Sequence, residues 1–295
     1  MAKVEIQKWA DKAMYEAEEM PKDERGNVTP QVHLISATTD PLGAIAAASA
    51  IYSGKVIRSL EEVTDEMRRD AWEQTKKTHL KAPLEYVDFH FMIEGVTRAF
   101  THQMVRQRTA VYSQESLRFA VKENISEEVA LPPSIKDVPQ GDGVWQNAID
   151  AIDTCYRYLV ENGMPAEDAR GLLPHSITTR LHYKTNLRNL LEHAGNRLCT
   201  QAQFEWRLVF AQLVDAIRNY DPVYPPTRHS FEMGWQFRLI ADDNVFRPVC
   251  YEKGYCPFMA TFDRDCTIRE RVNRGEFDSI DDAEWLLDPA AARRG

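Results

Sequence analysis

The sequence lacks any long apolar run: no stretch approaches the roughly 20 consecutive apolar residues that a helix needs to cross a bilayer. The first 26 residues lack a continuous apolar segment and are rich in acidic side chains. We therefore expect neither a membrane span nor a secretory signal. Internal repeats and low-complexity blocks are also missing, so the chain is expected to fold as ordinary globular domains.

Cysteine is scarce, and its five copies are an odd number. In a chain without a predicted signal, reduced thiols in the cytosol are the default. The last three cysteines, in "CYEKGYCPFMATFDRDC" (250–266), stand six and ten residues apart. Structural zinc sites use closer pairs such as C-x₂-C. We expect no metal site, and we expect these cysteines to pack as small apolar residues.

Basic residues are outnumbered: 36 Lys and Arg stand against 45 Asp and Glu, which gives a net charge of −9. Proteins that bind the phosphate backbone of nucleic acids usually show a basic balance or stripe, so we expect no nucleic-acid partner. Hydrophobic residues make up 43% of the chain and aromatic residues 10%, which excludes global disorder. Local arginine clusters are then expected to bind a small anionic ligand.

Three regions are expected along the chain: a charged leader at 1–30, a main domain at 31–220 and a C-terminal extension at 221–295. A Pro- and Gly-rich linker is expected at 131–143. Met233, Trp235 and Phe237 alternate and predict a strand or another packing element. The other expected elements are strands at 32–40 and 84–95 and helices at 41–54, 64–78, 96–108, 144–162, after Pro165, and at 186–218.

The segment "VRQRTAVYSQESLRF" (105–119) concentrates polar side chains. Gln103 and Arg106 would share one face of a helix, whereas Arg108 would lie about 200° from Arg106. If the following residues are extended, Ser116 and Arg118 point the same way. Such a segment could hold an anion, because the guanidinium fork binds phosphate in a bidentate manner. The alternative is that these arginines pair with acidic surface residues.

A second arginine-rich segment is "TNLRNLLEHAGNRLCTQAQFEWR" (185–207). Asn186 stands at the expected N-cap of its helix. Arg188 and Arg197 are nine residues apart, on opposite sides of that helix, so they would serve different ligands or subunits. The expected core-facing stripe consists of Leu187, Leu190, Leu191, Ala194 and Leu198.

Four motifs in order resemble the flavin-dependent thymidylate synthases. "RQRTAVYSQESLR" (106–118) fits the family signature of Arg-His-Arg, a spacer and Ser-x-Arg. "VHLISATTDPLGAIAAASAIYSG" (32–54) looks like the family's first strand and alanine-rich helix. "HLKAPLEYVDFHF" (79–91) looks like its His-x-(Ser/Thr)-Pro-x-Glu-His element. The segment at 185–207 looks like its Asn-x-Arg-Ser-Leu helix with the Gln-x-Glu pattern that follows.

This resemblance implies an α+β fold, with mixed helices around an antiparallel-type sheet. The implied reaction transfers a methylene from 5,10-methylenetetrahydrofolate to C5 of dUMP and reduces it to the methyl of dTMP. The implied cofactor is FAD, which NADPH reduces and which supplies the hydride. A homotetramer in a bacterial, archaeal or phage-infected host cytoplasm is implied as well, with active sites where subunits meet.

The resemblance also implies the site residues. Arg197, Ser116 and Arg118 would be the catalytic residues, with the arginines on the nucleotide's anionic groups and the serine hydrogen-bonding near the uracil. No cysteine lies in these motifs as a nucleophile. The implied dUMP residues are Gln103, Arg106, Gln114, Glu115, Ser116, Leu117, Arg118, Arg170 and Arg197. The implied flavin residues are His79, Ala82, Arg106, Gln107, Arg108, Gln114, Asn186, Arg188 and Glu192.

Four positions depart from the family pattern. Gln107 replaces the central His of the signature; it can donate and accept hydrogen bonds but carries no charge. Ala82 replaces a Ser or Thr, so only its backbone could contact the flavin. Tyr86 replaces a His, and Glu192 replaces a position often held by Asn.

Two alternatives follow from these departures and from the C-terminal extension. The same fold could transfer the one-carbon unit without full reduction and yield a hydroxymethyl pyrimidine nucleotide. The chain could also be a non-catalytic nucleotide-binding relative, in which case the purified protein would be colourless and would not oxidise NADPH.

Overall fold

The chain divides into two compact units and contains one four-stranded sheet. The computed structural model describes residues 19–24, 26–222, 230–257 and 266. The first unit comprises Met1–Pro30, Glu94–Thr101 and Gln114–Leu181, and the second comprises Gln31–Ile93, His102–Ser113 and His182–Gly295. Strands β2 and β4 each contribute residues to both units.

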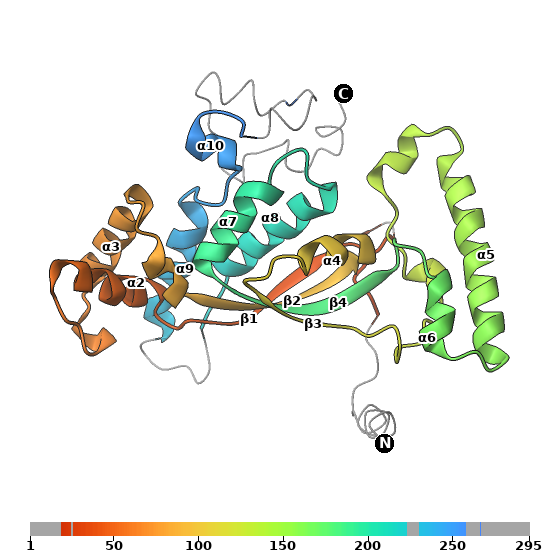
Figure 1. Ribbon diagram of the computed structural model, residues 1–295, viewed down its shortest axis with the longest axis horizontal. Coiled ribbons are helices and arrows are strands. Elements are labelled where there is room, and N and C mark those ends of the chain that lie inside the picture. Colours follow the sequence, from red (N-terminus) through yellow and green to blue (C-terminus); the bar gives the residue numbers. More distant parts are fainter. Residues whose placement is uncertain (1–18, 25, 223–229, 258–265, 267–295) are drawn as a thin grey trace. The chain divides into compact units, whose positions relative to one another are not determined.

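The strand order in the sheet is β1-β2-β4-β3, drawn in Figure 1. The strands are β1 (Gln31–Ala37), β2 (Asp88–Thr97), β3 (Val111–Gln114) and β4 (Thr178–Asn186). The N–H of Thr38 donates to the carbonyl of Asp88 at 3.0 Å, and that of Leu187 donates to Val87 at 2.8 Å. Each bond joins the end of one strand to the start of its neighbour, as in an antiparallel sheet.

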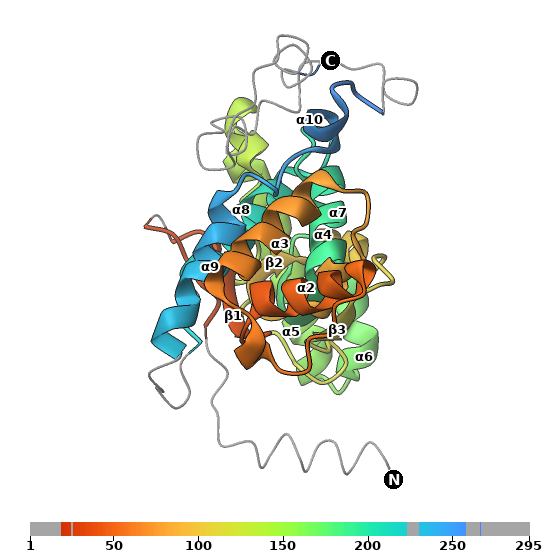
Figure 2. The same ribbon diagram turned by 90° about the vertical axis from the view of Figure 1, so that its left-hand side faces the viewer.

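Helices pack on β1 in the second unit and on one another in both units. In the second unit α8 packs on β1 and on α9, and α2 packs on α3, as Figures 1 and 2 show. In the first unit α5 packs on α6. The helices are α2 (Pro41–Ala50), α3 (Asp65–Lys77), α4 (Arg98–Met104), α5 (Gly141–Glu161), α6 (Ala166–Ala169), α7 (Leu187–Arg197), α8 (Phe204–Arg218), α9 (Ser230–Asp242) and α10 (Val249–Lys253).

A buried ion pair holds α2 to α3. Asp40 caps α2, and its carboxylate accepts from the Gly43 N–H at 2.9 Å and from Arg68 Nε at 3.0 Å. The two side chains belong to residues only 6% and 7% exposed. Burial raises the pKa of Asp40, but hydrogen bonds from Arg68, Gln236 and Gly43 outweigh it, so the net pKa lies below the usual value. The ionised pair is therefore the stable state at neutral pH.

The first unit has its own apolar core beneath α5. The cluster consists of Ile125, Ile149, Tyr156, Ala169 and Ile177. Beside it the ammonium of Lys122, a residue only 3% exposed, bonds to Glu115 at 3.0 Å and to Glu128 at 2.6 Å. Two carboxylates thus compensate the charge that this buried lysine carries.

Most of the expected elements are confirmed, with boundary shifts. The helices expected at 41–54, 64–78, 96–108 and 144–162 correspond to α2, α3, α4 and α5. The helix after Pro165 is α6, and the first expected strand is β1. The second expected strand begins only at Asp88, because a 3₁₀-helix with Pro83 in its first turn occupies Ala82–Tyr86. The linker also contains a short 3₁₀-helix, Pro133–Asp137.

Three expectations differ from the structure in whole or in part. The single helix at 186–218 is two helices, α7 and α8, because residues 198–203 form a turn in which the Ala202 N–H donates to Cys199. Ser116 and Arg118 are not in an extended segment: the Ser116 carbonyl accepts from Phe119 and Ala120 at 3.0 and 2.9 Å, which makes a turn. The strand expected around Trp235 is helix α9.

Several other expectations concern the ends of the chain. The charged leader lies mostly outside the described residues, as does the tail beyond residue 257 apart from Cys266.

The five cysteines are all free thiols. Within the described ranges no group of three or more His, Cys, Asp or Glu side chains is placed to hold a metal ion. Among the helices that the structure describes, none is long and apolar enough to cross a membrane.

Candidate functional site

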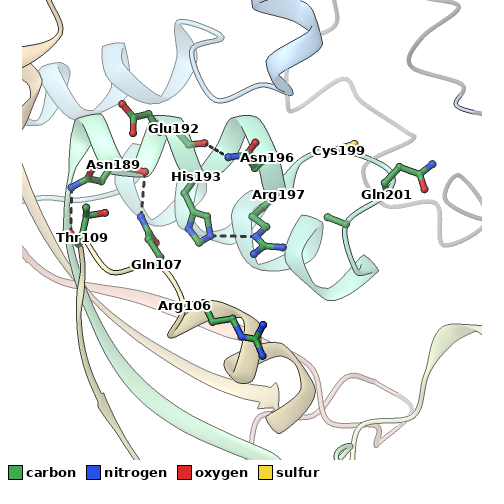
Figure 3. A pocket seen from close by; sticks show the side chains of 11 residues that line it. Arg106, Gln107, Thr109, Asn189, Glu192, His193, Asn196, Arg197, Cys199 and Gln201 are labelled. Atoms are coloured by element: carbon green, nitrogen blue, oxygen red, sulfur yellow. Dashed lines mark hydrogen bonds between the residues drawn. The ribbon is translucent and has the colours of Figure 1, made fainter. Parts of the chain in front are cut away.

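A pocket of about 470 Å³ lies in the second unit between the end of α4 and helix α7. Figure 3 shows Arg106 and Gln107 on one side and Asn189, His193 and Arg197 on the other. The loop after α7 closes the pocket with Cys199, Gln201 and Ala202. The two arginine-rich segments singled out in the sequence are thus brought together.

Arg197 is held from three directions at the C-terminal end of α7. Its Nε donates to His193 Nε2 at 3.4 Å, and its Nη1 donates to Gln103 Oε1 at 3.4 Å. Its guanidinium lies 4.8 Å from the ring centre of Trp206, a cation–π distance. Gln103 is fixed in turn, since its Oε1 accepts from Trp206 Nε1 at 3.1 Å. The guanidinium is thereby held in one orientation at the edge of the pocket.

His193 is a neutral acceptor for this arginine. Burial, and secondarily the charge of Arg197, lowers its pKa to about 3. Its ring packs edge-on against Trp206 and Phe210, with centroid distances of 4.8 and 5.7 Å. Because Nε2 accepts from Arg197, the other ring nitrogen, Nδ1, carries the hydrogen, and it is buried without a described partner. His193 therefore positions Arg197 without adding charge to the pocket.

Gln107 occupies the position where the family signature has His. Its Nε2 donates to the carbonyl of Asn189 at 3.4 Å, and its Oε1 accepts from the Tyr183 hydroxyl at 2.9 Å. Tyr183 is fully buried, and burial raises its pKa. The Tyr112 hydroxyl donates to the Gln107 carbonyl at 3.2 Å. The amide suits this place because it donates and accepts at once, so the absence of a family histidine leaves no unpaired group here.

Replacing Gln107 by leucine is expected to lower the free energy of unfolding by about 1–3 kcal/mol, because the buried Tyr183 hydroxyl would lose its acceptor. Urea denaturation followed by circular dichroism measures the loss. Gln107→His, which restores a ring-nitrogen acceptor, is the matched variant and is expected to lose less. Equal stability of wild type and Gln107→Leu would contradict this role of the amide.

The other residues implied for the flavin lie mainly on the opposite side of α7. Arg188 bonds to Glu85 at 2.5 Å and to Glu192 at 3.1 Å. The Asn186 side chain caps α7 by accepting from the Asn189 N–H at 2.9 Å. Arg188 lines a second pocket and Arg197 the first, as their nine-residue spacing predicts. The remaining implied flavin residues of this unit, His79, Ala82 and Arg108, are exposed.

The remaining nucleotide residues belong to the first unit. Gln114 Nε2 donates to Thr101 Oγ1 at 2.9 Å, and the Glu115 carboxylate is bonded to Lys122 and to Thr179. Leu117 packs against the apolar cluster beneath α5. These side-chain contacts hold residues 114–117 in place within the first unit, so the Glu115 carboxylate has a structural role. The sequence had not singled out Lys122, the residue that this carboxylate neutralises.

Arg118 and Arg170 meet at one acidic residue, Glu167. Arg118 donates to its carboxylate through Nη2 at 2.8 Å and Nε at 3.1 Å, and Arg170 Nε donates to its carbonyl at 3.0 Å. Both arginines are exposed. The alternative raised from the sequence, that arginines pair with glutamates, therefore holds for Arg118 and Arg188. Arg106 is exposed and shows no side-chain bond to any residue that the structure describes.

Sequence reasoning missed several residues of the pocket around Arg197, above all His193, Asn189 and Gln201. A signal existed for His193, which precedes Arg197 by four residues and so lies on the same face of α7. Trp206 could not be found in this way, because its contact with Gln103 spans 103 residues of sequence.

Comparison with known proteins places this chain in a family. The family model described as thymidylate synthase complementing protein matches residues 33–223. A flavin-dependent thymidylate synthase of Geobacter sulfurreducens is 32% identical over 194 residues, which cover 65% of this chain and 84% of the relative. The chain belongs to the flavin-dependent thymidylate synthase family. The resemblance inferred from the four motifs is thereby confirmed.

Other members of the flavin-dependent thymidylate synthase family agree with this assignment. A flavin-dependent thymidylate synthase of Pyrococcus abyssi is 30% identical over 251 residues, covering 82% of this chain and 95% of the relative. A solved UMP/dUMP methylase, PolB from Streptomyces cacaoi bound with 5-Br dUMP, superposes with a TM-score of 0.52 at 19% identity. It covers 68% of this chain and 92% of its own. This likeness confirms the α+β fold with an antiparallel sheet.

The donor set of the Arg197 pocket is suited to a flavin. An isoalloxazine ring carries carbonyl oxygens and ring nitrogens that accept hydrogen bonds along one edge. Two residues that line the pocket, His193 and Gln201, each have a donor, Nδ1 and Nε2, that is buried without a partner in the described part of the chain. A buried donor without a partner is costly, and a ligand acceptor would satisfy it. Arg106 adds a charged donor to the same pocket.

Proposed function

We propose that this protein is a flavin-dependent thymidylate synthase that converts dUMP to dTMP. The carbon donor would be 5,10-methylenetetrahydrofolate, and NADPH-reduced FAD would be the hydride source. The observation that carries this proposal is the pocket in which Arg197 is fixed by His193, Gln103 and Trp206, within a chain of this family. When bound, FAD supplies the redox chemistry of the reaction.

Arg197 would bind the uracil of dUMP and stabilise the negative charge that develops on its carbonyl oxygen during carbon transfer. Three features support this role: the guanidinium keeps its charge, its orientation is fixed before the ligand arrives, and it borders the pocket. A donor fixed in advance stabilises a developing charge more strongly than a mobile one. Gln103, bonded to Arg197, would orient the base through its amide.

The residues of the 114–118 segment and Arg170 would bind the rest of the nucleotide. Arg118 and Arg170 would take the phosphate, and the Ser116 hydroxyl would hydrogen-bond near the uracil. Ser116 is bonded locally, with its Oγ 3.4 Å from the Arg118 N, and no described bond joins that hydroxyl to a base. This supports a binding role rather than nucleophilic attack. In the proposed catalytic set, Ser116 and Arg118 would therefore act by holding the nucleotide beside Arg197.

The flavin would be held by Arg106, Gln107, Arg108, Gln114, Asn186, Arg188, Glu192, His79 and Ala82. Arg106, Gln107 and Glu192 line the first pocket, and Arg188 and Glu192 line the second. Gln107 would contact the flavin as a neutral side chain. Its amide is bonded to Asn189 and Tyr183. Its role is to hold the α4 end against α7 rather than to donate a proton.

The active protein would be a cytoplasmic homotetramer whose active sites lie where subunits meet. The proposed nucleotide residues fall into two groups, Gln103, Arg106 and Arg197 in the second unit and the 114–118 segment with Arg170 in the first. In the assembly the two groups of one active site would come from different subunits. Light scattering coupled to gel filtration would give a mass of four chains, and a monomeric mass would contradict the shared site.

The proposed function is tested with the purified full chain. The protein should be yellow, with a flavin absorption band that NADPH bleaches and that responds to dUMP. With dUMP, 5,10-methylenetetrahydrofolate and NADPH, mass spectrometry should detect dTMP. A hydroxymethyl nucleotide would replace this proposal by the partial-reduction alternative. A colourless protein that leaves NADPH unoxidised after reconstitution with FAD would replace it by the non-catalytic one.

A further inference from the structure

The second pocket, of about 550 Å³, lies on the other side of α7, and the C-terminal segment 243–252 forms one of its walls. The other walls are α3, the 3₁₀-helix Ala82–Tyr86 and α7. Segment 243–252 lies beyond residues 33–223, the part of the chain that the family model matches. This pocket is thus completed by residues outside the matched domain.

Segment 243–252 is anchored where it contributes to the pocket. Trp72 Nε1 donates to Asp243 Oδ2 at 2.6 Å, and the ammonium of Lys76 pairs with the same carboxylate. Further along, Val249 lies against Gly195 of α7, where an added Cβ would be in ordinary van der Waals contact with the Val249 Cβ at 3.5 Å. Two points of attachment, one on α3 and one on α7, hold the segment as a fixed wall.

Most cations in the lining of this pocket have assigned partners, and Glu252 adds a carboxylate to the same lining. Lys76 pairs with Glu73 and Asp243, and Arg188 pairs with Glu85 and Glu192.

Lys81 donates to the carbonyls of Thr75 and Lys76 at 2.7 and 3.1 Å, which satisfies the C-terminal end of α3. Arg247 differs from these cations: it lines the pocket, it is only partly exposed, and no bond joins its side chain to a residue that the structure describes. A guanidinium in this setting is suited to a phosphate group, which it can bind in a bidentate manner.

The two pockets border each other on α7. Glu192 and Asn196 line both of them, with Arg197 in the first and Arg188 in the second. FAD is an elongated molecule with the isoalloxazine at one end, adenosine at the other and a diphosphate between them. A single FAD whose ring occupies the first pocket can therefore place its diphosphate in the second.

We propose that segment 243–252 is part of the cofactor site and that Arg247 binds the diphosphate of FAD. This inference rests on the proposed function and extends it to a residue outside the family-matched range. Arg247 then makes the chain selective for the dinucleotide over flavins without phosphate. The C-terminal segment, rather than the matched domain alone, determines how tightly this chain holds its cofactor.

The test compares binding of FAD and riboflavin to the flavin-free full chain by fluorescence titration. Arg247→Gln is expected to raise the Kd for FAD about tenfold and to leave the Kd for riboflavin within twofold of wild type. Arg247→Lys, which keeps a charge but not the fork, should fall between them. Lys253→Gln removes an exposed charge directly after the segment and outside the pocket, and it is expected to change neither Kd.

The outcomes distinguish a failure of the inference about Arg247 from a failure of the proposed function. If wild type binds FAD and Arg247→Gln binds it equally well, the inference is overturned while the proposed function stands. Equal weakening of FAD and riboflavin would also overturn it, because the variant would then act on the fold of the pocket. If reconstituted wild type binds neither flavin, the proposed function fails and this inference fails with it.

Discussion

Arg197→Lys is expected to lower kcat for dTMP formation by about 100-fold or more, with little effect on folding. Arg197 is held by His193 and Gln103 and lies over Trp206. A lysine ammonium cannot make the two directional bonds at once and lacks the planar group that stacks on the indole. Loss of one fixed donor to a developing negative charge typically costs two to three orders of magnitude in rate.

The measurement is single-turnover formation of dTMP, followed by chromatography, together with the Kd for dUMP. A rate loss larger than the change in Kd would place Arg197 in the transition state, whereas equal changes would assign it to binding. Arg157→Lys is the matched control, since the side chain of Arg157 is 52% exposed and, among the described contacts, pairs only with Asp153 of the same helix. Turnover of Arg197→Lys within threefold of wild type would refute the catalytic assignment.

Asp40→Asn is expected to lower the free energy of unfolding at pH 7 by about 3 kcal/mol, because it removes the buried counter-charge of the Arg68 guanidinium and leaves only the exposed Asp65. Asparagine still caps α2 by accepting from the Gly43 N–H, so the change isolates the loss of charge. Urea denaturation followed by tryptophan fluorescence gives the value.

The pH dependence of this difference follows from the lowered pKa of Asp40. A carboxyl whose pKa is lower in the folded than in the unfolded chain stabilises the fold above its unfolded pKa, about 3.9. The difference between wild type and Asp40→Asn should therefore be constant near neutrality and shrink as the pH falls below about 4. Asp65→Asn is the control, since Asp65 pairs with the same Arg68 but its side chain is 69% exposed. We expect it to cost less than about 1 kcal/mol. Equal losses for the two variants would contradict the dominance of the buried pair.

The sequence predicted well those elements whose ends carry local signals. Helix α2 starts at an Asp-Pro capping pair, and α3 starts after Thr64 with two acidic residues in its first turn. Prediction from the sequence failed where tertiary contacts determine the type or the end of an element. The break between α7 and α8 contains no Pro or Gly, and the apolar periodicity runs on through Leu198, so nothing local marks the turn. In α9, Phe237, Ile240 and Ala241 are buried at helical spacing, which the alternation of 233, 235 and 237 had obscured.

The residues of the candidate site could likewise be predicted only where a local motif marks them. Motifs located Arg106, Gln107, Arg188 and Arg197, because each lies in a short segment with fixed spacing. The sequence could not indicate what surrounds Arg197, since Gln103 reaches Trp206 and Gln203 from about 100 residues away. The contribution of Arg247 was also out of reach, as segment 243–252 carries none of the motifs and is placed by Trp72 and Gly195.

The pairing of Arg118 with Glu167 has a consequence for ligand exchange. An anion that binds Arg118 must first displace this carboxylate, which is tethered in the same unit and so competes at a high effective concentration. A singly charged competitor gains nothing by the exchange, because it replaces one carboxylate by an equivalent charge. A phosphate monoester carries close to two charges at pH 7 and more acceptor oxygens, so it gains on displacing Glu167. If Arg118 binds the nucleotide as proposed, Glu167 would compete with the incoming anion, and a phosphate monoester would displace it more readily than a small monoanion would.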